Sequence, residues 1–330
     1  MKELAISCGL APNRDCVGNA KRAEALGYER VWMYDSPALY GDLWVGLARV
    51  AEATERIGLG TAVAVPSTRH VMTTASAIAT IEDLSPGRLA CAFGSGFTAQ
   101  RAMGRKAMRW SDVKAYVLAL RGLLRGETVE YDGTAHQMIH SPGFAPKRPI
   151  CVPLLIAPMG PKGMAVAHEI GDGVMVTDAT GPEPGFDWCV ALLNGSVLDP
   201  GEDHTSARVR NAVGPWFVTS YHAIWEMAPD ALAGMPGGAE WRARIEAERP
   251  EGERHLAVHE GHVVAITDRD EPTLDAVGEA LLQTGWTGDA AAVRARAEAA
   301  AAAGVTELLY TPAGPDVERE LEAFIVAVRG

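Results

Sequence analysis

Hydrophobic positions along the chain predict strands and helices in regular alternation, most clearly between residues 57 and 96. Residues 57–65 form an apolar run, Ile78, Ile81 and Leu84 fall on one helical face, and a second apolar run, 89–93, ends before a Gly-Ser-Gly turn. Neither run alternates with polar residues, which is typical of parallel strands buried on both faces. The stretch therefore predicts one complete strand–helix–strand unit.

The same pattern extends over the chain as eight strand-plus-helix units. Parallel strands joined by helices at this spacing favour closure into a (β/α)8 TIM barrel. The expected strands are 4–8, 30–34, 57–65, 89–93, 150–156, 173–177, a segment within 208–220, and 305–311. The expected helices are 14–26, 43–54, 111–124, 161–170, 187–193, 289–303 and 316–328, and a hairpin turning at Asp132-Gly133 precedes the fifth strand.

Regularity is lost after the predicted seventh strand. Residues 221–265 mix aromatic and apolar residues with Gly and Pro, which predicts a helical insertion that caps the barrel. We expect one domain over residues 1–330, with a variable region at about 181–285 that shapes the substrate pocket. Length does not argue against this, because α/β barrels of this size are ordinary single domains.

Composition restricts the partners. With 48% hydrophobic and 22% charged residues the chain has a globular balance, and its net charge of −12 with no Lys/Arg run argues against nucleic acid and anionic membranes. No apolar run reaches the ~18 residues of a membrane span, and the first apolar run is broken too early for a signal peptide. We therefore expect a cytoplasmic protein that acts on a small molecule.

The strand ends carry few groups for acid–base or metal chemistry. Gly94-Ser95-Gly96 lacks the third glycine of a dinucleotide fingerprint, since residue 99 is Ala, so an open Rossmann sheet is disfavoured. The active site of a barrel lies where its strands end, and an apolar mouth is typical of enzymes whose cofactor supplies the reaction. The candidates at these ends are Asp35, residues 62–65, 94–100 and 157–160, Thr177, Asp178 and the loop after Ser220.

Two blocks of sequence give a family resemblance. Residues 73–96, with Thr68-Arg69-His70 before them, resemble the core signature of the luciferase-like flavin or deazaflavin oxidoreductases, and residues 156–173 resemble the coenzyme-phosphate segment of the same family. The nearest branch contains methylenetetrahydromethanopterin reductase and F-420-dependent glucose-6-phosphate dehydrogenase. The resemblance implies hydride transfer between coenzyme F-420 and a small organic substrate, often in a homodimer. An FMN-dependent monooxygenase and a non-catalytic flavin-binding relative are the alternatives.

The resemblance also implies roles for individual residues. Asp35 matches an aspartate near the deazaflavin ring, and Ala62-Val63 matches a bulge whose non-prolyl cis peptide supports the back of the ring. Gly94, Ser95 and Gly96 would let the backbone approach a flat ligand, because glycine carries no side chain. The further residues assigned to the coenzyme are Gln100 and, for its phosphate, Ala157, Met159, Gly160 and Thr177.

Two positions depart from the family pattern. Ser36 stands where relatives commonly have a histidine, and Phe97 stands where the reductase branch is usually acidic. A hydroxyl does not titrate near neutral pH as imidazole does, so the proton-handling role does not transfer to Ser36. The catalytic residue is therefore open, with Asp35 as the candidate.

Three histidines, His255, His259 and His262, lie at spacings of four and three residues. Such spacing can place metal ligands on one helical face, but Gly261 interrupts the helix pattern and no acidic residue stands at a matching strand end. We therefore expect no metal site here, and favour a substrate contact from a mobile loop.

Overall fold

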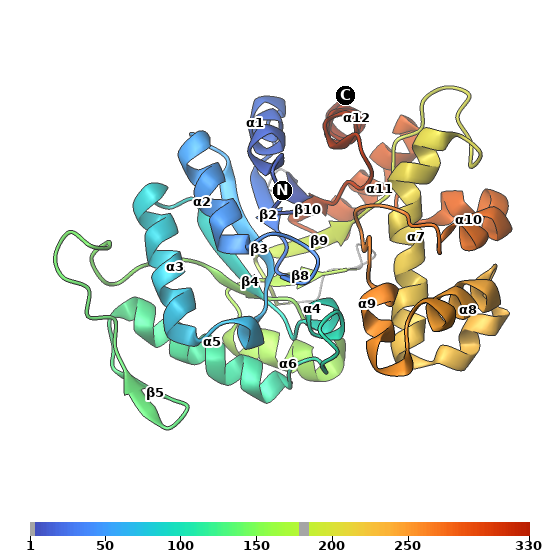
Figure 1. Ribbon diagram of the computed structural model, residues 1–330. Helices are drawn as coiled ribbons and strands as arrows, with labels where there is room; N and C mark the ends of the chain where they lie inside the picture. The colour runs from blue at the N-terminus through green and yellow to red at the C-terminus, as the bar shows by residue number, and fades with distance from the viewer. Residues whose placement is uncertain (1–3, 178–184) are drawn as a thin grey trace.

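Eight parallel strands close into a barrel, as predicted, in a computed structural model that describes residues 4–177 and 185–330 (Figure 1). Asp178 and residues 181–184 of the variable region lie outside the described residues. The order around the barrel is β1-β10-β9-β8-β7-β4-β3-β2. The strands are β1 Ala5–Leu10, β2 Arg30–Met33, β3 Gly58–Ala64, β4 Leu89–Phe93, β7 Leu154–Ile156, β8 Val174–Val176, β9 Cys189–Leu193 and β10 Glu307–Tyr310.

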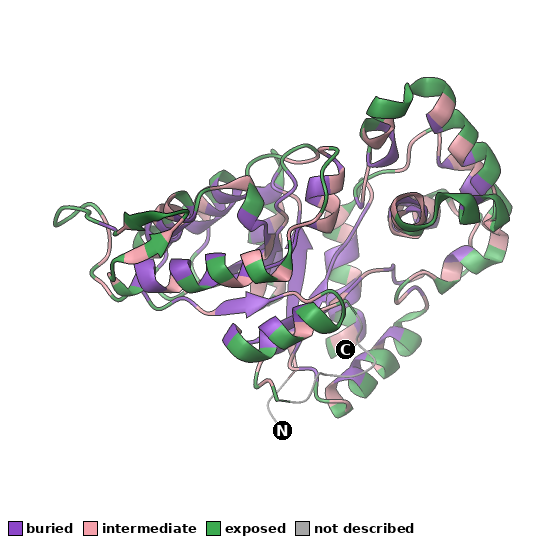
Figure 2. Cartoon of the chain, turned by 90° about the horizontal axis from the view of Figure 1, so that it is seen from below, coloured by how far each residue is buried: buried purple, intermediate pink, exposed green. Residues whose placement is uncertain are grey.

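Helices surround the barrel and bury one face each against its strands (Figure 2). The helices up to β8 are α1 Cys16–Leu26, α2 Leu43–Ala53, the short η1 Pro66–Thr68, α3 Val71–Leu84, α4 Phe97–Arg101, α5 Trp110–Arg125 and α6 Gly160–Ile170; α11 Ala290–Ala302 and α12 Val317–Arg329 close the ring. The predicted hairpin is also present as β5 Val129–Tyr131 and β6 Thr134–His136. Its turn residues Asp132 and Gly133 both have positive φ, which the tight hairpin turn requires.

The inside of the barrel is a packed core. Trp32, Leu155, Met175, Val190 and Leu309 fill it with small Ala side chains of β4. One buried carboxylate, Glu307, accepts hydrogen bonds from the indole N–H groups of Trp32 at 2.8 Å and Trp188 at 2.9 Å. Since these bonds satisfy the indoles inside the barrel, the interior is a closed support for the mouth above it.

The predicted seventh strand was wrong, and so was the helix predicted at 187–193. The seventh strand is β9, and residues 208–220 belong to the long helix α7 Ala207–Met227. The run in β9 is buried throughout except at Leu192, and periodicity does not distinguish such a short apolar run from a buried helix. In α7, burial of Val209, Val213 and Val218 follows helical spacing, but the Gly214-Pro215 pair inside the helix resembles a break.

A separate group of helices lies between β9 and β10 and packs beside the barrel (Figure 1). We call residues 207–283 the helical lobe. Trp241, Tyr221 and Leu232 are fully buried in its own apolar cluster. Besides α7 the lobe contains η2 Pro229–Gly234, α8 Gly238–Glu248, η3 Glu251–Glu253, α9 Arg254–Val258, α10 Glu271–Val277 and η4 Gly278–Gln283.

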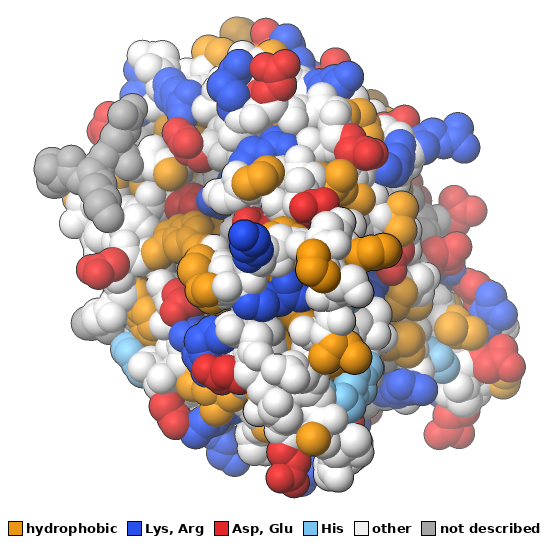
Figure 3. Space-filling view, turned by 90° about the vertical axis from the view of Figure 1, so that its left-hand side faces the viewer, with side chains coloured by type: hydrophobic (Ala, Val, Ile, Leu, Met, Phe, Trp, Pro, Cys, Tyr) orange, Lys and Arg blue, Asp and Glu red, His pale blue; other side chains and the backbone are white. Residues whose placement is uncertain are grey.

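The surface is mixed in charge. On the face shown in Figure 3, Lys and Arg side chains are interspersed with Asp and Glu, and hydrophobic side chains lie between them. The strand expected at 150–156 is shorter than predicted: β7 begins only at Leu154, and Cys151 before it is exposed. Among the helices that the structure describes, none has the length and apolar character needed to cross a bilayer.

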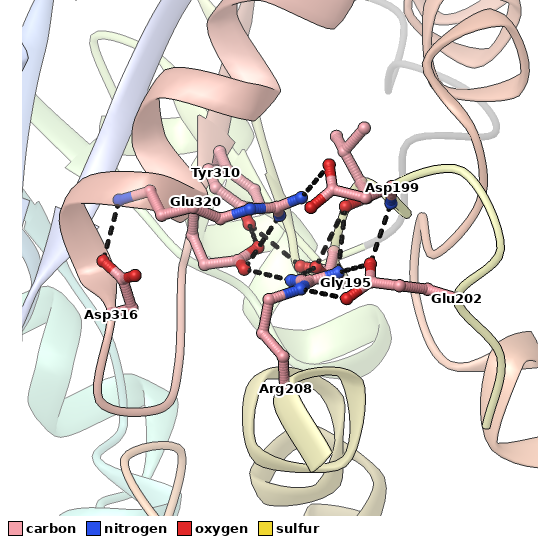
Figure 4. Close-up of polar contacts among 10 residues, drawn as sticks. Gly195, Asp199, Glu202, Arg208, Tyr310, Asp316 and Glu320 are labelled. Atoms are coloured by element: carbon pink, nitrogen blue, oxygen red, sulfur yellow. Dashed lines mark hydrogen bonds and ion pairs between the residues drawn. The ribbon is translucent and has the colours of Figure 1, made fainter. Parts of the chain in front are cut away.

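A buried ion network joins the lobe to the barrel (Figure 4). Glu320 on α12 is 2% exposed and accepts from Arg208 of α7 at 2.6 Å and from Arg319 at 3.0 Å. Arg208 also pairs with Glu202, and Arg319 with Asp199 at 2.8 Å. The two guanidinium groups are thus neutralised by the buried carboxylate of Glu320 and by the carboxylates of Asp199 and Glu202 in the loop that follows β9.

Replacing Glu320 tests how much this network contributes to the stability of the protein. Glu320→Gln removes a buried negative charge from two arginines, so we expect the free energy of unfolding to fall by about 3 kcal/mol. Glu322→Gln on the same helix breaks a surface pair with Arg22, for which we expect about 0–1 kcal/mol. Urea denaturation of the two variants measures both, and an equal loss would show that the network contributes no more than a surface pair.

Candidate active site

A cavity of about 290 Å³ opens at the carboxyl ends of the barrel strands. Its wall is mainly apolar, with a few hydroxyl groups and one imidazole. It is close to the lower end of the range for ligand pockets, roughly 300–1,000 Å³. The lining residues are Tyr34, Asp35, Ser36, Tyr40, Ala62, Val63, Val65, Gly94, Ser95, Gly96, Phe97, Thr98, Ala99, Ala157, Pro158, Met159, Met175, Thr177, Leu192, Trp216, His262 and Val263.

The ends of β3 and β4 form one wall. The register between the two strands shifts between Thr61 and Ala64, and the Ala62–Val63 peptide is cis, which confirms the bulge and the cis peptide that the resemblance implied. A Cβ atom on Gly94 would lie 2.8 Å from Val63 Cγ2, and one on Gly96 would lie 2.4 Å from Val65 Cγ1. Glycine is therefore needed at both positions, because the chain after β4 packs too closely against Val63 and Val65 for a side chain to fit. The missing side chains also leave the cavity open.

Asp35 lines the cavity, but its carboxylate is occupied by protein donors. It accepts from the backbone N–H of Val65 at 3.0 Å, from the Thr68 hydroxyl at 3.2 Å and from Arg69 at 2.7 and 2.8 Å. Arg69 is shared with Asp42, which caps α2. Asp35 thus fixes the turn after β3, and in this arrangement it is a positioning residue for the wall that Ala62, Val63 and Val65 form.

Two tyrosines beside Asp35 were missed by the sequence analysis. The rings of Tyr34 and Tyr40 are 5.6 Å apart, and burial raises the pKa of both hydroxyls above the ordinary value. Tyr40 donates a hydrogen bond to the backbone carbonyl of His262 at 2.7 Å. This bond joins the loop after β2 to the helical lobe across the edge of the cavity. Neither tyrosine belongs to a motif, although Tyr34 directly precedes Asp35.

The helical lobe contributes His262, Val263 and Trp216 to the cavity. His262 Nε2 lies 3.4 Å from the Thr98 hydroxyl, and its Nδ1 lies 2.8 Å from Nδ1 of His222 on α7. Burial, with His259 nearby, lowers the pKa of His262 to about 3, so its imidazole is neutral at physiological pH. The sequence analysis favoured a substrate contact for this group of histidines, and of the three His262 lines the cavity, whereas His255 and His259 are outside the lining.

The segment between β7 and α6 continues the wall formed by the ends of β3 and β4, because β7 is the neighbour of β4 in the barrel. Ala157 and Met159 line the cavity together with Thr177 at the end of β8, whereas Gly160, the first residue of α6, is exposed and outside the lining. No side chain caps the first turn of α6. Gln100 is also outside the lining: it is buried in α4, and its side-chain nitrogen has no hydrogen-bond partner.

The arrangement suits binding and orientation better than hydrolysis. Within the described residues of the lining, the Thr98 hydroxyl contacts an imidazole nitrogen, that of His262, only at 3.4 Å, and burial lowers the pKa of that imidazole to about 3, which makes it a weak base. The carboxylate of Asp35 is already committed to Arg69. The remaining polar groups, Ser36, Ser95, Thr98, Thr177 and neutral His262, can hold a ligand by hydrogen bonds. A cavity of this kind needs a cofactor to carry out a difficult reaction.

A glycine-to-alanine substitution tests the packing of the β3–β4 wall. Gly94→Ala places a methyl group against Val63, so we expect the free energy of unfolding to fall by about 1–3 kcal/mol. In a Val63→Ala background the same substitution should cost under about 1 kcal/mol, because its steric partner is gone.

The matched control is Gly18→Ala in α1, where no heavy atom lies within 4 Å of the added Cβ. We expect this change to be neutral or stabilising by about 0.5–1 kcal/mol. If Gly94→Ala costs the same with and without Val63, as measured by urea denaturation, the close contact does not limit this wall.

Comparisons with solved structures support the fold. A coenzyme F420-dependent tetrahydromethanopterin reductase from Methanopyrus kandleri superimposes with a TM-score of 0.63 at 21% identity, covering 98% of this chain and 97% of that one. An F420-dependent secondary alcohol dehydrogenase, solved with an F420–acetone adduct, gives 0.64 at 19% identity over the full length of both chains. At these identities the likeness shows a shared fold.

Among curated proteins, the chain is 32% identical over 192 residues to a 5,10-methylenetetrahydromethanopterin reductase of Methanolobus tindarius, which is 56% of each protein. It is also 32% identical over 190 residues to an F420-dependent glucose-6-phosphate dehydrogenase of Beutenbergia cavernae, with 52% of this chain and 54% of that protein covered. The chain thus spans about half the length of the curated relatives it matches. The family model described as luciferase-like monooxygenase matches residues 7–307, and the chain belongs to this family.

Proposed function

We propose that this protein is an oxidoreductase that binds a deazaflavin of the F-420 type in the barrel mouth and transfers a hydride to or from a small organic substrate. The observation that carries the proposal is the apolar cavity on the ends of β3, β4 and β7, bounded by Ala62-Val63, Gly94 and Ala157. The proposal draws further support from the curated relatives, whose names include F420-dependent dehydrogenases.

The wall residues fit a flat aromatic ring. Ala62, Val63 and Ala157 contribute small apolar side chains, and Gly94 and Gly96 contribute none. When bound, the deazaflavin supplies the hydride-transfer chemistry. The protein would hold the coenzyme ring and the substrate in position, because the hydride donor and acceptor must lie close together and water must be kept out. Asp35 contributes indirectly by fixing the turn from Val65 to Arg69.

A phosphate of the coenzyme would bind at the start of α6. The uncapped first turn presents free backbone N–H groups and the positive end of the helix dipole, and Thr177 adds a hydroxyl. Pro161 in the first turn removes one donor, but the N–H groups after it are kept. Ala157, Met159 and Gly160 would thus set the backbone path toward the anion. Gln100 does not reach the cavity, so it takes no part in this proposal.

The substrate would enter between the coenzyme seat and the helical lobe. There His262 offers the imidazole that residue 36 lacks, beside the hydroxyls of Ser36 and Thr98. A neutral imidazole can donate or accept a hydrogen bond at a substrate oxygen. Because the lobe supplies His262 and Trp216 to the cavity, we propose that residues 1–330 work as one domain.

We also propose that the protein is located in the cytoplasm and forms a homodimer.

An FMN-dependent monooxygenase is the second candidate. It is supported by a likeness to the oxygenating constituent of 3,6-diketocamphane monooxygenase of Pseudomonas putida, solved with FMN, at a TM-score of 0.58 and 13% identity. Fluorescence titrations of the protein with F-420 and with FMN separate the two candidates. We expect F-420 to bind at least tenfold tighter. Tighter FMN would favour the monooxygenase, and binding of neither would refute both.

Filling the cavity tests where the coenzyme binds. Ala157→Trp places an indole in the mouth, so we expect the affinity for F-420 to fall at least 50-fold. The control is Ala165→Trp on the exposed face of α6, which should change the affinity less than twofold. Titration by F-420 fluorescence measures both variants, and unchanged binding by Ala157→Trp would exclude this cavity as the coenzyme seat.

A further inference from the structure

Three histidines converge where the helical lobe meets the barrel mouth. His222 comes from α7, and His259 and His262 come from the turn after α9. One ring nitrogen of each lies within 4.8 Å of the others, and the side chains of His222 and His259 are 3% and 2% exposed. His255, which the sequence grouped with the last two, lies instead beside Gly104.

Hydrogen bonding within the protein does not satisfy this group. A shared proton explains the 2.8 Å contact between Nδ1 of His222 and Nδ1 of His262. His259 uses Nε2 toward Glu226 at 3.3 Å, and its Nδ1 is buried with no partner. A buried, unpaired ring nitrogen is uncommon and costly. Any group that bonds all three rings at once would remove this cost.

We propose that His222, His259 and His262 form a binding site for a divalent transition-metal ion of the Zn²⁺ type. Three neutral imidazoles with a fourth position left open are a known ligand set for zinc. Two Zn–N bonds of about 2.1 Å at a tetrahedral angle place the nitrogens about 3.4 Å apart. The longest separation, at most 4.8 Å, therefore has to contract by at most about 1.4 Å, within the range of a side-chain adjustment.

The surroundings support the ligand role. Metal-binding histidines usually direct their second nitrogen to an outer oxygen, and here Nε2 of His259 faces Glu226 while Nε2 of His262 faces the Thr98 hydroxyl. The ring of Trp241 stacks on that of His222 with 5.9 Å between their centroids, and its indole N–H donates a hydrogen bond to Asp270 at 2.9 Å.

Two arginines near the three histidines would repel a bound cation, but each is paired with a carboxylate. Arg101 pairs with Glu226 at 3.0 Å, and Arg269 pairs with Glu248 and Glu260 at 2.7 Å each. The metal would join α7 to the turn that carries His262, and so hold that imidazole at the cavity. This role is independent of which coenzyme the mouth binds.

Metal titration of the full chain tests the site. The protein, free of any histidine tag and treated with a chelator, is titrated with Zn²⁺ by calorimetry. We expect one equivalent to bind with a dissociation constant below about 1 μM, and Co²⁺ to give the visible absorption of a four-coordinate site with three nitrogen ligands. Failure of the wild-type protein to bind one equivalent more tightly than about 10 μM overturns the proposal, whatever the variants do.

Variants locate the ion. His222→Gln and His259→Gln should each weaken Zn²⁺ binding at least 100-fold, because each removes one of three ligands. His255→Gln is the matched control and should leave the affinity within twofold. Binding that survives both His222→Gln and His259→Gln would place the ion elsewhere and overturn the proposal. Circular dichroism of each variant verifies that the helical lobe is folded.

Discussion

The contact between the ends of β3 and β4 is the constraint on which the barrel mouth depends. The register shift in β3 directs Val63 and Val65 toward β4, and only glycine fits opposite them at positions 94 and 96. Interiors are packed so tightly that one methyl group added here has to displace a neighbour. The flat, apolar wall of the cavity is therefore a product of strand packing, and the open space beside it follows from the same two glycines.

Polar contacts hold this wall in place from outside the cavity. Asp35 gathers the Val65 N–H, the Thr68 hydroxyl and Arg69 into one buried network, which fixes the chain where it leaves β3. The lobe is joined to the barrel in a comparable way by Glu320 with Arg208, and across the cavity by Tyr40 with His262. Such networks are useful for positioning because a buried charge that loses its partner is strongly unfavourable.

The sequence predicted the barrel well where strands are separated by clear helices, and failed where burial removes the pattern. β9 is a short, nearly continuous apolar run, and the helical pattern of α7 is interrupted by Gly214-Pro215, so the two types were exchanged. The cis Ala62–Val63 peptide was predicted from family resemblance and confirmed. The contact between His222 and His262 was not predicted, because the two residues are 40 apart in sequence and only the packing of the lobe brings them together.

The cavity above Ala62-Val63 and Gly94 is the seat that we propose for the redox ring. A crystal structure of the protein with F-420 tests this claim most directly. We predict electron density for the deazaflavin ring in that cavity, against the ends of β3 and β4, with the coenzyme phosphate directed toward the start of α6. Density for the coenzyme at another surface, with the cavity left to solvent, would contradict the account.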